Sequence, residues 1–555
     1  MKTSKNEPRA ETRRAMPILC GADIELANFV ASAEPACGTG YEASRALLAE
    51  IEGMPIRKDS HSLNSRWSAA PAVSRTGANT GKGVYFPASG WGYNLQDVAR
   101  RFLPGNGGCA YIDLDHAELC IPEVLSALDH VASWHAMLRL MRGALDRANE
   151  GRPQDRRIKV LVNNSDGHGH SWGSHLNFLI SRGTWDNIFF LKAHYLAYLA
   201  SFQVSSILLT GQGKVGSENG RPRTPYQLSQ RSDHMETLMG VQTTFRRPLV
   251  NARDEALSGR STGDDPSAPA RLHCIFHDSA MAHGSCLFRV GPMQLILALM
   301  ESGKVNPRLI LDDPLEALES FSHDPTLKAT AKVITGQHLT VLELQSAFLD
   351  EVKRYAAQGM FEGVVPRFEQ IIALWEDALN KFAEGDLMAL APRLDWVMKL
   401  MAIERAIDDN PSLDWDSPEI KMIDHLYSSL DDDGLYRAYE ASGFTEQLVS
   451  PERIAYFIDN PPEDTRAWTR AMLLRRAKSG NVEVDGVDWD RITFKIRGRY
   501  AWPSYRAFEM ANPLGFTRAA AEPVFESCMD FGDLLDGLES LGSEAALPSH
   551  AIEVN

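Results

Sequence analysis

The sequence predicts an α+β fold: a curved, mainly antiparallel sheet carries acidic side chains on its concave face, helices lie behind it, and a small C-terminal domain follows. The sheet is predicted by three acidic stretches in strand or turn contexts, at residues 21–26, 111–118 and 163–169. The helices are predicted by apolar residues that recur at helical spacing from Glu123 to Asn149, and again beyond about residue 285.

The first acidic stretch follows a strand-like run that ends at Cys20. Successive side chains of a strand alternate between its two faces, so Asp23 and Glu25 are expected to point the same way. Two neighbouring carboxylates repel each other unless a cation lies between them. A solvated strand edge is the alternative interpretation of any single acidic pair.

The second acidic stretch shows the same alternation. Its expected polar face consists of Cys109, Tyr111, Asp113 and Asp115, and its apolar face of Ala110, Ile112 and Leu114. A half-buried strand presents acidic groups to a cleft in this way. Hard oxygen ligands suit Mg²⁺ or Mn²⁺, typically alongside substrate phosphates. Three such clusters in series therefore predict one metal and nucleotide site.

The order of segments predicts a large catalytic unit between less regular stretches. We expect a flexible leader, a catalytic domain with a long insertion rich in Ser, Gly, Ala and Asn, a small C-terminal domain and a tail. Their bounds are 1–16 for the leader, 17–440 for the catalytic domain with its insertion at 57–105, 441–525 for the C-terminal domain and 526–555 for the tail. Within the catalytic domain, residues 174–182 are expected to open a helix.

Composition narrows the class of protein. The 555 residues are 44% hydrophobic and 23% charged, as in folded soluble proteins. A net charge of −16 argues against nonspecific binding of nucleic acid or anionic membranes. Seven cysteines without a Cys-x-x-Cys pair predict neither a disulfide framework nor a zinc ribbon, and they fit a reducing cytoplasmic setting. The oligomeric state is not predicted.

A series of ordered motifs runs from residue 21 to about residue 513. It includes Gly21-Ala22-Asp23-Ile24-Glu25, Asn106-Gly107-Gly108-Cys109, Asp113, His116-Ala117-Glu118, Gly173-Ser174-His175, Arg253-Asp254-Glu255, Arg271-Leu272-His273 and Trp489-Asp490. In this series the chain resembles the Pup ligase and Pup deamidase (Dop) family of the carboxylate-amine ligase superfamily. The resemblance implies a glutamine-synthetase-like catalytic domain that uses ATP and Mg²⁺ or Mn²⁺.

The resemblance also implies roles for individual residues. Asp113 is the expected catalytic aspartate and Trp489 a nucleotide contact. The expected metal-site residues are Asp23, Glu25, Tyr111, Glu118, His175 and His273. For the two histidines, a turn cap or a satisfied core hydrogen bond is the alternative interpretation. Guanidinium groups offer a fork of donors, so Arg231, Arg247 and Arg253 are candidate nucleotide ligands and Arg271 a candidate substrate ligand. Surface salt bridges are the alternative for each arginine.

Four positions depart from the family pattern. They are Cys109, which stands in place of an arginine, Ile121, Leu176 and His283. Three hypotheses of function follow. The first is Dop-like hydrolysis of a side-chain amide or isopeptide bond, which the long insertion and the five-residue step from Asp113 to Glu118 favour. In that hypothesis the substrate is a peptide or a Pup-like protein. The second is an ATP-consuming ligase that phosphorylates the γ-carboxylate of a non-Pup peptide or amino acid and joins it to an amine. The third is a catalytically weak binding protein.

Overall fold

The computed structural model describes residues 16–31, 39–55, 100–254, 265–480, 482–496 and 504–542. Ten strands form its main sheet. They are β1 (Cys20–Val30), β2 (Met54–Pro55), β3 (Arg101–Phe102), β4 (Cys109–Asp113), β5 (His116–Cys120), β6 (Ile158–Leu161), β7 (Leu176–Ser181), β10 (Met235–Gly240), β11 (Arg247–Asn251) and β12 (Pro269–Cys274).

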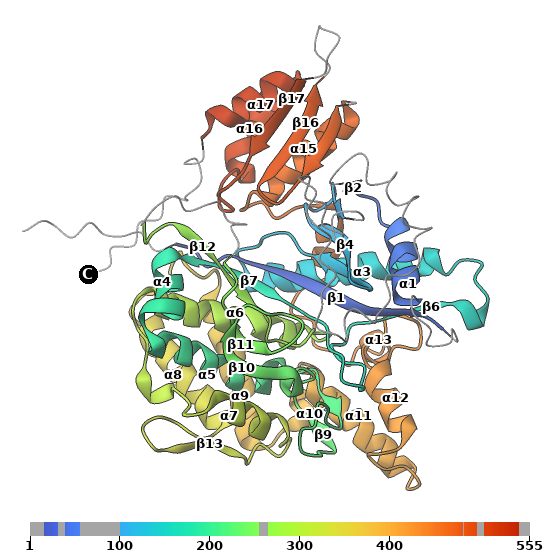
Figure 1. Cartoon of the computed structure of the whole chain (residues 1–555), viewed down its shortest axis with the longest axis vertical. Coiled ribbons are helices and arrows are strands. Elements are labelled where there is room, and N and C mark those ends of the chain that lie inside the picture. Colours follow the sequence, from blue (N-terminus) through green and yellow to red (C-terminus); the bar gives the residue numbers. More distant parts are fainter. Residues whose placement is uncertain are drawn as a thin grey trace, which may run out of the picture.

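The strands of this sheet follow the order β10-β11-β12-β7-β1-β5-β4-β3-β2, and β6 pairs with β1. Among the described strands, β10 and β11 run parallel and the other pairings in the sheet are antiparallel. The long strand β1 crosses the middle of the sheet in Figure 1. These pairings confirm the predicted α+β fold with a mainly antiparallel sheet.

The same unit contains a series of helices. They are α1 (Thr39–Ala49), α3 (Ala127–Ala148), α4 (Arg182–Asp186), α5 (Ala193–Thr210), α6 (His283–Glu301), α7 (Pro314–Ser322), α8 (Val341–Ala356), α9 (Phe368–Glu384), α10 (Leu387–Leu390), α11 (Asp395–Asp409), α12 (Pro418–Leu426), α13 (Leu435–Ala441) and α14 (Pro451–Asp459). Two further antiparallel pairs of short strands are β8 (Lys214–Val215) with β9 (Tyr226–Gln227) and β13 (Thr330–Lys332) with β14 (His338–Thr340).

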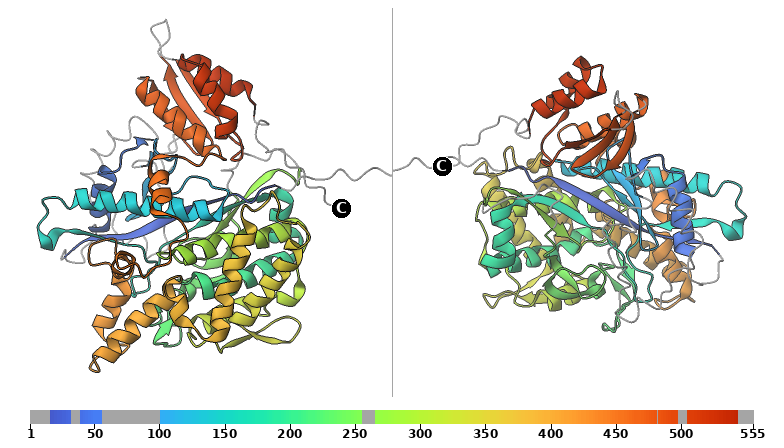
Figure 2. Two further views of the ribbon diagram at one scale, coloured as in Figure 1. Left: turned by 180° about the vertical axis from the view of Figure 1, so that it is seen from behind. Right: turned by 45° about the horizontal axis from the view of Figure 1, so that its top comes forward.

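The core lies between the apolar face of the sheet and these helices. Ile24 and Leu26 of β1 are fully buried in the same cluster as Val131 and Met141 of α3, and every residue of α6 before Glu301 is buried. Figure 2 shows α3 running across the back of the sheet. Burial of this apolar surface stabilises the fold by about 25 cal/mol per Å². The polar side chains of the strands therefore lie on the opposite face of the sheet.

A smaller unit stands at one edge of the sheet (Figures 1 and 2). It consists of α15 (Ala467–Ser479), β15 (Glu483–Val487), β16 (Arg491–Ile496), β17 (Ser504–Glu509), α16 (Arg518–Ser527) and α17 (Phe531–Ser540). Its apolar cluster includes Leu534, Leu535 and Leu538 of α17. The expectation of a tail from residue 526 therefore does not hold for α17, whose leucines at helical spacing complete this core.

Two local expectations also differ from the structure. Residues 174–182 were expected to open a helix, but most of them form β7, because β1 and β12 provide strand partners on both sides. The apolar spacing after Pro122 begins a helix only at Ala127. Ser126 caps that helix by accepting the N–H of Leu128 at 3.2 Å, and Val124 still bridges to Cys20 of β1.

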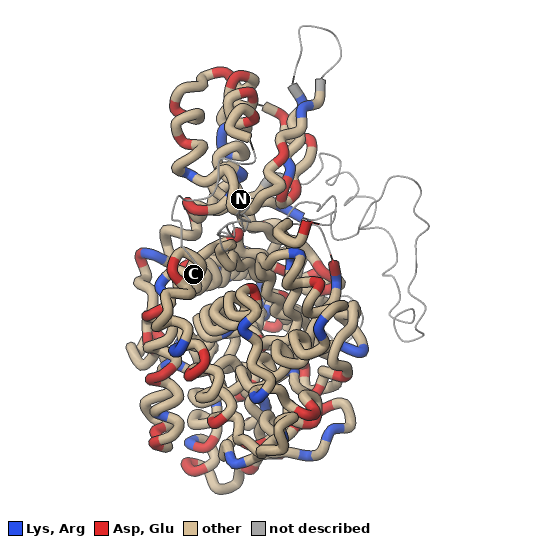
Figure 3. Tube along the Cα trace, turned by 90° about the vertical axis from the view of Figure 1, so that its left-hand side faces the viewer, with Lys and Arg blue, Asp and Glu red and all other residues tan. Residues whose placement is uncertain are grey.

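Part of the predicted organisation lies outside the described residues, namely nearly all of the leader 1–16 and residues 57–99 of the insertion 57–105. Within the described segments, no helix combines the length and hydrophobicity needed to cross a bilayer. Basic and acidic residues are interspersed along the trace in Figure 3.

Candidate active site

The candidate site is one face of the main sheet, and the strand register assembles it. Asp23 lies opposite Cys120 and Glu25 opposite Glu118 across β1 and β5. On the other side of β5, Tyr111 of β4 lies opposite Glu118 and Cys109 lies opposite Cys120. Directly opposed residues of neighbouring strands point to the same face, so side chains that are far apart in sequence form one polar grid.

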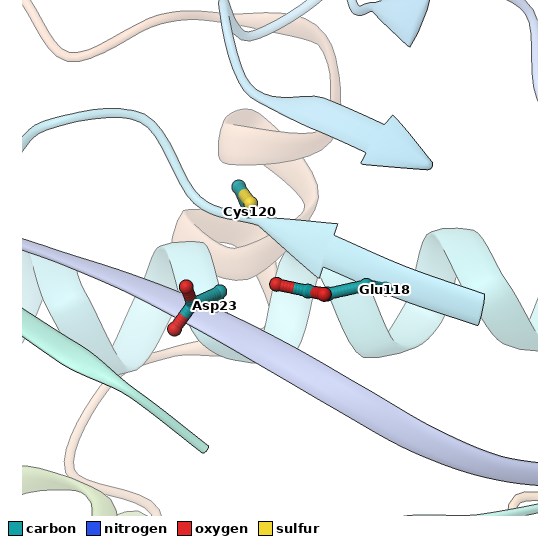
Figure 4. A group of neighbouring side chains, drawn as sticks. All are labelled: Asp23, Glu118 and Cys120. Atoms are coloured by element: carbon teal, nitrogen blue, oxygen red, sulfur yellow. The ribbon is translucent and has the colours of Figure 1, made fainter. Parts of the chain in front are cut away.

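Acidic oxygens converge in two overlapping groups. Asp23, Glu118 and Cys120 offer ligand atoms that all lie within 4.8 Å of one another, and so do Glu25, Asp113 and Glu118. Glu118 belongs to both groups. In Figure 4 the carboxylates of Asp23 and Glu118 lie side by side between β1 and β5, with Cys120 next to them. The structure thus brings together the four carboxylates that the sequence proposed.

Glu118 is the most buried of these acids, at 2% exposed. The Tyr111 hydroxyl donates to its Oε1, while its Oε2 and the Oδ1 of Asp23 are buried without a hydrogen-bond partner among the described residues. Burial raises the pKa of Glu118 well above its ordinary value, and the nearby Asp23, Glu25 and Asp113 raise it further. A divalent cation would compensate this concentration of negative charge, so the donor set fits Mg²⁺ or Mn²⁺.

Glu25 lies against the segment that leads into β7, where Glu25 N–H donates to the Gly173 carbonyl and Asp23 N–H to the His175 carbonyl. The Gly173 N–H donates to Glu25 Oε2 at 2.7 Å. A Cβ at position 173 would lie 2.2 Å from His175 Nε2 and 2.8 Å from Glu25 Oε1, so a larger residue there would displace one of these two side chains. His175 Nδ1 lies 3.7 Å from Asp23 Oδ1, and its ring meets His273 edge-on at 5.0 Å.

His273 adjoins the cation site as a neutral ring. Burial lowers its pKa well below the ordinary value, and the neighbouring His175 and Arg271 lower it further. A neutral imidazole is the form that binds metals. His273 lies on β12, and His175 lies directly before β7. Both rings adjoin the acidic side chains.

Two predicted arginines converge on the segment just before Gly173. Arg231 Nη1 donates to the carbonyl of Trp172, and Arg247 Nη2 donates to the carbonyl of Ser171 at 2.6 Å. Arg231 is 1% exposed, and its Nε and Nη2 have no hydrogen-bond partner among the described residues. Burial lowers the pKa of Arg231 to about 10, with Arg247 lowering it and Glu25 raising it. Such donors suit an anion next to the cation site.

The other two arginines lie toward the β11 side. Arg271 donates to Asn177 Oδ1 at 2.5 Å, from a strand position opposite Leu179. The backbone N–H of Arg253 donates to Asn251 Oδ1 at 2.9 Å, just after β11. Asn251 pairs with His273, which places Arg253 near that histidine.

Trp489 belongs to the C-terminal unit and contacts the end of the polar sheet face that carries Cys109. Its ring meets the edge of Phe102 at 5.1 Å, and Phe102 of β3 lies opposite Cys109 of β4. Arg470 lies 4.9 Å over the same indole ring. The C-terminal unit therefore contributes an aromatic side chain to the Cys109 end of the site.

Sequence reasoning missed three features. Cys120 belongs to an acidic group, and its position two residues after Glu118 would have revealed their shared face. The guanidinium of Arg100 lies 4.4 Å over the Tyr111 ring. Glu123 pairs with two arginines of the C-terminal unit, a contact between segments too distant for a local pattern to reveal.

Four residues that the sequence analysis discussed, namely Leu114, Asp115, Leu176 and His283, do not lie among the acidic side chains of the site. Leu114 and Asp115 form the turn between β4 and β5, where Leu114 has φ of 52° and is 73% exposed, so neither continues the strand alternation. Leu176 is fully buried opposite Ala22, on the apolar side of the sheet. His283 begins α6 behind the sheet and accepts the Leu448 N–H at 3.2 Å.

Comparison with known proteins adds three findings. A family model described as "Pup-ligase protein" matches residues 48–493. The chain is 34% identical to the Pup deamidase/depupylase of Mycolicibacterium smegmatis over 72% of this chain and 76% of that protein. It is 32% identical to the Pup--protein ligase of Acidimicrobium ferrooxidans over 69% of this chain and 81% of that protein.

The fold is also shared with a solved structure. The Pup ligase PafA in complex with ADP is 24% identical, with a TM-score of 0.65 over 81% of this chain and 91% of that one. This match confirms the predicted α+β fold.

Proposed function

Because the chain belongs to the Pup ligase family, we propose that it is an ATP- and Mg²⁺-dependent enzyme of side-chain amide bonds. Its substrate is a γ-carboxyl or carboxamide group of a peptide or a Pup-like protein. The favoured reaction is Dop-like hydrolysis of an amide or isopeptide bond. The observation that carries this proposal is the convergence of Asp113 with Glu25 and Glu118 on the polar sheet face.

Asp113 is the proposed reactive group. It ends β4, opposite His116, and its side chain is half-buried beside Glu118. As a nucleophile it attacks the amide carbon, the C–N bond breaks, and the nitrogen leaves as an amine after gaining a proton. Water then cleaves the acyl-aspartate, which restores Asp113 and releases the γ-carboxylate. As a base in ligation, the same carboxylate takes a proton from the incoming amine.

The remaining grid residues bind and orient. Asp23, Glu25 and Glu118 would hold the cation, which when bound neutralises charge that develops on phosphate or acyl oxygens. Arg231 and Arg247 present donors for nucleotide phosphates beside these acids, and Trp489 offers an aromatic face to the base. Arg271, fixed by Asn177, suits a substrate carboxylate.

The turn between β4 and β5 supports the hydrolase assignment. The five-residue step from Asp113 to Glu118 is the Dop-like spacing, and here Asp113 pairs directly with His116 across a two-residue turn. One more residue would lengthen the turn and displace Asp113. The ligase alternative rests on the relatives named as Pup ligases, whose identity to the chain is similar.

The cellular setting follows from the cysteines. Each cysteine in the described segments is a free thiol. Free thiols persist in reducing compartments, so we place the protein in the cytoplasm.

Product analysis separates the hypotheses. The purified chain is incubated with ATP, Mg²⁺ and a Pup-like protein ending in glutamine, or with one ending in glutamate plus an acceptor protein. A hydrolase releases ammonia with little ADP, whereas a ligase forms ADP and conjugate in equal amounts. An absence of both products, with ATP still bound, would reject both reactions and leave a binding protein. Asp113→Asn controls for contaminating enzymes.

A further inference from the structure

We propose that Asp23, Glu118 and Cys120 form a mixed carboxylate–thiolate site that selects a thiophilic divalent transition-metal ion, such as Co²⁺ or Zn²⁺, over Mg²⁺. This inference deepens the proposed function, on which it rests for the presence of a cation at this sheet face. It concerns one of the two overlapping groups of ligand atoms, the one that contains sulfur.

The strand register holds the three ligands. Asp23 lies directly opposite Cys120 on the neighbouring strand, and Glu118 lies two residues before Cys120 on β5. All three therefore project from the same sheet face, from regular backbone on central strands (Figure 4). A site built on paired strands keeps its geometry better than a site built on loops.

The distances suit a single ion. The ligand atoms lie within 4.8 Å of one another. Zinc–sulfur and zinc–oxygen bonds are roughly 2.3 and 2.0–2.2 Å long, so a small inward rotation of the side chains brings all three atoms onto one ion. Three protein ligands with one open position are typical of a reactive zinc site.

Burial provides an independent indication that a cation belongs here. Glu118 is 98% buried, since only 2% of its surface is exposed, and its Oε2 has no hydrogen-bond partner among the described residues. The buried Oδ1 of Asp23 has none either. Unpaired buried carboxylate oxygens are costly, and a cation between them removes that cost.

The sulfur ligand determines which kind of cation the site prefers. Thiolate ligands favour zinc and other thiophilic ions, whereas oxygen-only sets suit Mg²⁺. The neighbouring group of Glu25, Asp113 and Glu118 contains oxygen ligands alone. The two groups share Glu118, so the face offers a thiophilic position next to an oxygen-only group.

Cys109 provides a matched control. It is fully buried and lies directly opposite Cys120 on β4, yet it belongs to neither group of ligand atoms. Replacing either thiol by a hydroxyl changes the same atom in neighbouring positions of one hairpin, but only Cys120→Ser removes a proposed ligand.

Cobalt absorption tests the proposal without an activity assay. Metal-free full-length protein is titrated with Co²⁺ while thiolate-to-cobalt charge-transfer absorption is recorded. We expect the band in the native protein and in Cys109→Ser, and its loss in Cys120→Ser. A band that survives Cys120→Ser, or Co²⁺ binding to the native protein without any band, would overturn the proposal.

Competition supplies a measurement that needs no variant. Excess Mg²⁺ should fail to remove the cobalt band from the native protein, and complete displacement at millimolar Mg²⁺ would count against the site. The Asp113→Asn protein distinguishes this inference from the proposed function. It should lose turnover and keep the band. If the native protein shows the band but no amide chemistry, the proposed function fails and the metal site stands.

Discussion

Glu123 and Arg470 form a buried, two-pronged ion pair that ties the C-terminal unit to the catalytic sheet. Arg470 Nη2 donates to Glu123 Oε2 at 2.5 Å and its Nη1 donates to Oε1 at 3.1 Å. Arg466 Nε adds a third bond to Oε1 at 2.8 Å. Glu123 lies three residues after Cys120, so this pair anchors the strand that carries the acidic site.

We expect Glu123→Gln to destabilise the protein by about 3–5 kcal/mol, because it leaves buried guanidinium charge without its partner. The matched control is Glu463→Gln, which breaks the exposed pair with Arg518 at 2.8 Å and should cost about 0–1 kcal/mol. Urea unfolding measures both. Equal losses in the two variants would contradict the burial argument.

The same pair predicts a dependence of stability on pH. Burial alone would raise the pKa of Glu123, but the charges of Arg470 and Arg466 hold it at about 2, below its ordinary value of 4.5. Because the pKa of Glu123 is depressed in the folded state, the ion pair contributes its full stabilisation of the fold above pH 4.5. That contribution to the free energy of unfolding is lost as the pH falls toward 2. Glu123→Gln should therefore flatten the acid limb of the stability curve between these values. An unchanged limb would show that other carboxylates dominate it.

Asp113→Asn should abolish chemistry and spare the fold. The substitution keeps the shape of the side chain and removes its basicity and nucleophilicity, so turnover should fall by at least about 10²–10⁴. The side chain is only half-buried at the end of β4, so the thermal midpoint should barely move. Near-normal turnover would transfer the role to another group, and Asp115 in the adjacent turn is the next residue to replace.

Loss of a cation ligand should weaken nucleotide binding. Asp23→Ala and Glu118→Ala each leave the bound cation with fewer ligands and its phosphate partners less neutralised. Calorimetry with ATP and Mg²⁺ should show at least tenfold weaker binding, equivalent to about 1.4 kcal/mol. Asp312→Ala is the control, because its exposed carboxylate pairs with Lys332 at 2.9 Å and belongs to neither acidic group. Unchanged affinity in both site variants would reject the cation assignment.

Arg231→Gln should weaken nucleotide binding without Mg²⁺ as well as with it, because the change removes charged donors rather than a cation ligand. A hydrogen bond to a charged group is worth about 1.5–3 kcal/mol, so affinity should fall by roughly 10- to 150-fold. Arg221, which pairs with Glu319 at 2.9 Å and is partly exposed, provides the control. An equal effect of Arg221→Gln would indicate a general charge effect.

The sequence alone could predict which acidic side chains share a strand face. Alternation places Asp23 with Glu25 on β1, and Tyr111 with Asp113 on β4, because the period of a strand is a local property. The same rule fails at Leu114 and Asp115, where the chain turns and Leu114 adopts φ of 52°. Local apolar spacing also could not separate strand from helix in residues 174–182, since strand partners from β1 and β12 decide that outcome.

By itself, the sequence determined the acidic and apolar faces of individual strands, the amphipathic helices and, through its ordered motifs, the family. Only the tertiary structure decided which strands are neighbours. That order places Asp23 opposite Cys120, brings His175 and His273 to the acids, and docks Trp489 and Arg470 from the C-terminal unit. Pairing between distant strands depends on the burial of the whole core, which no local pattern encodes.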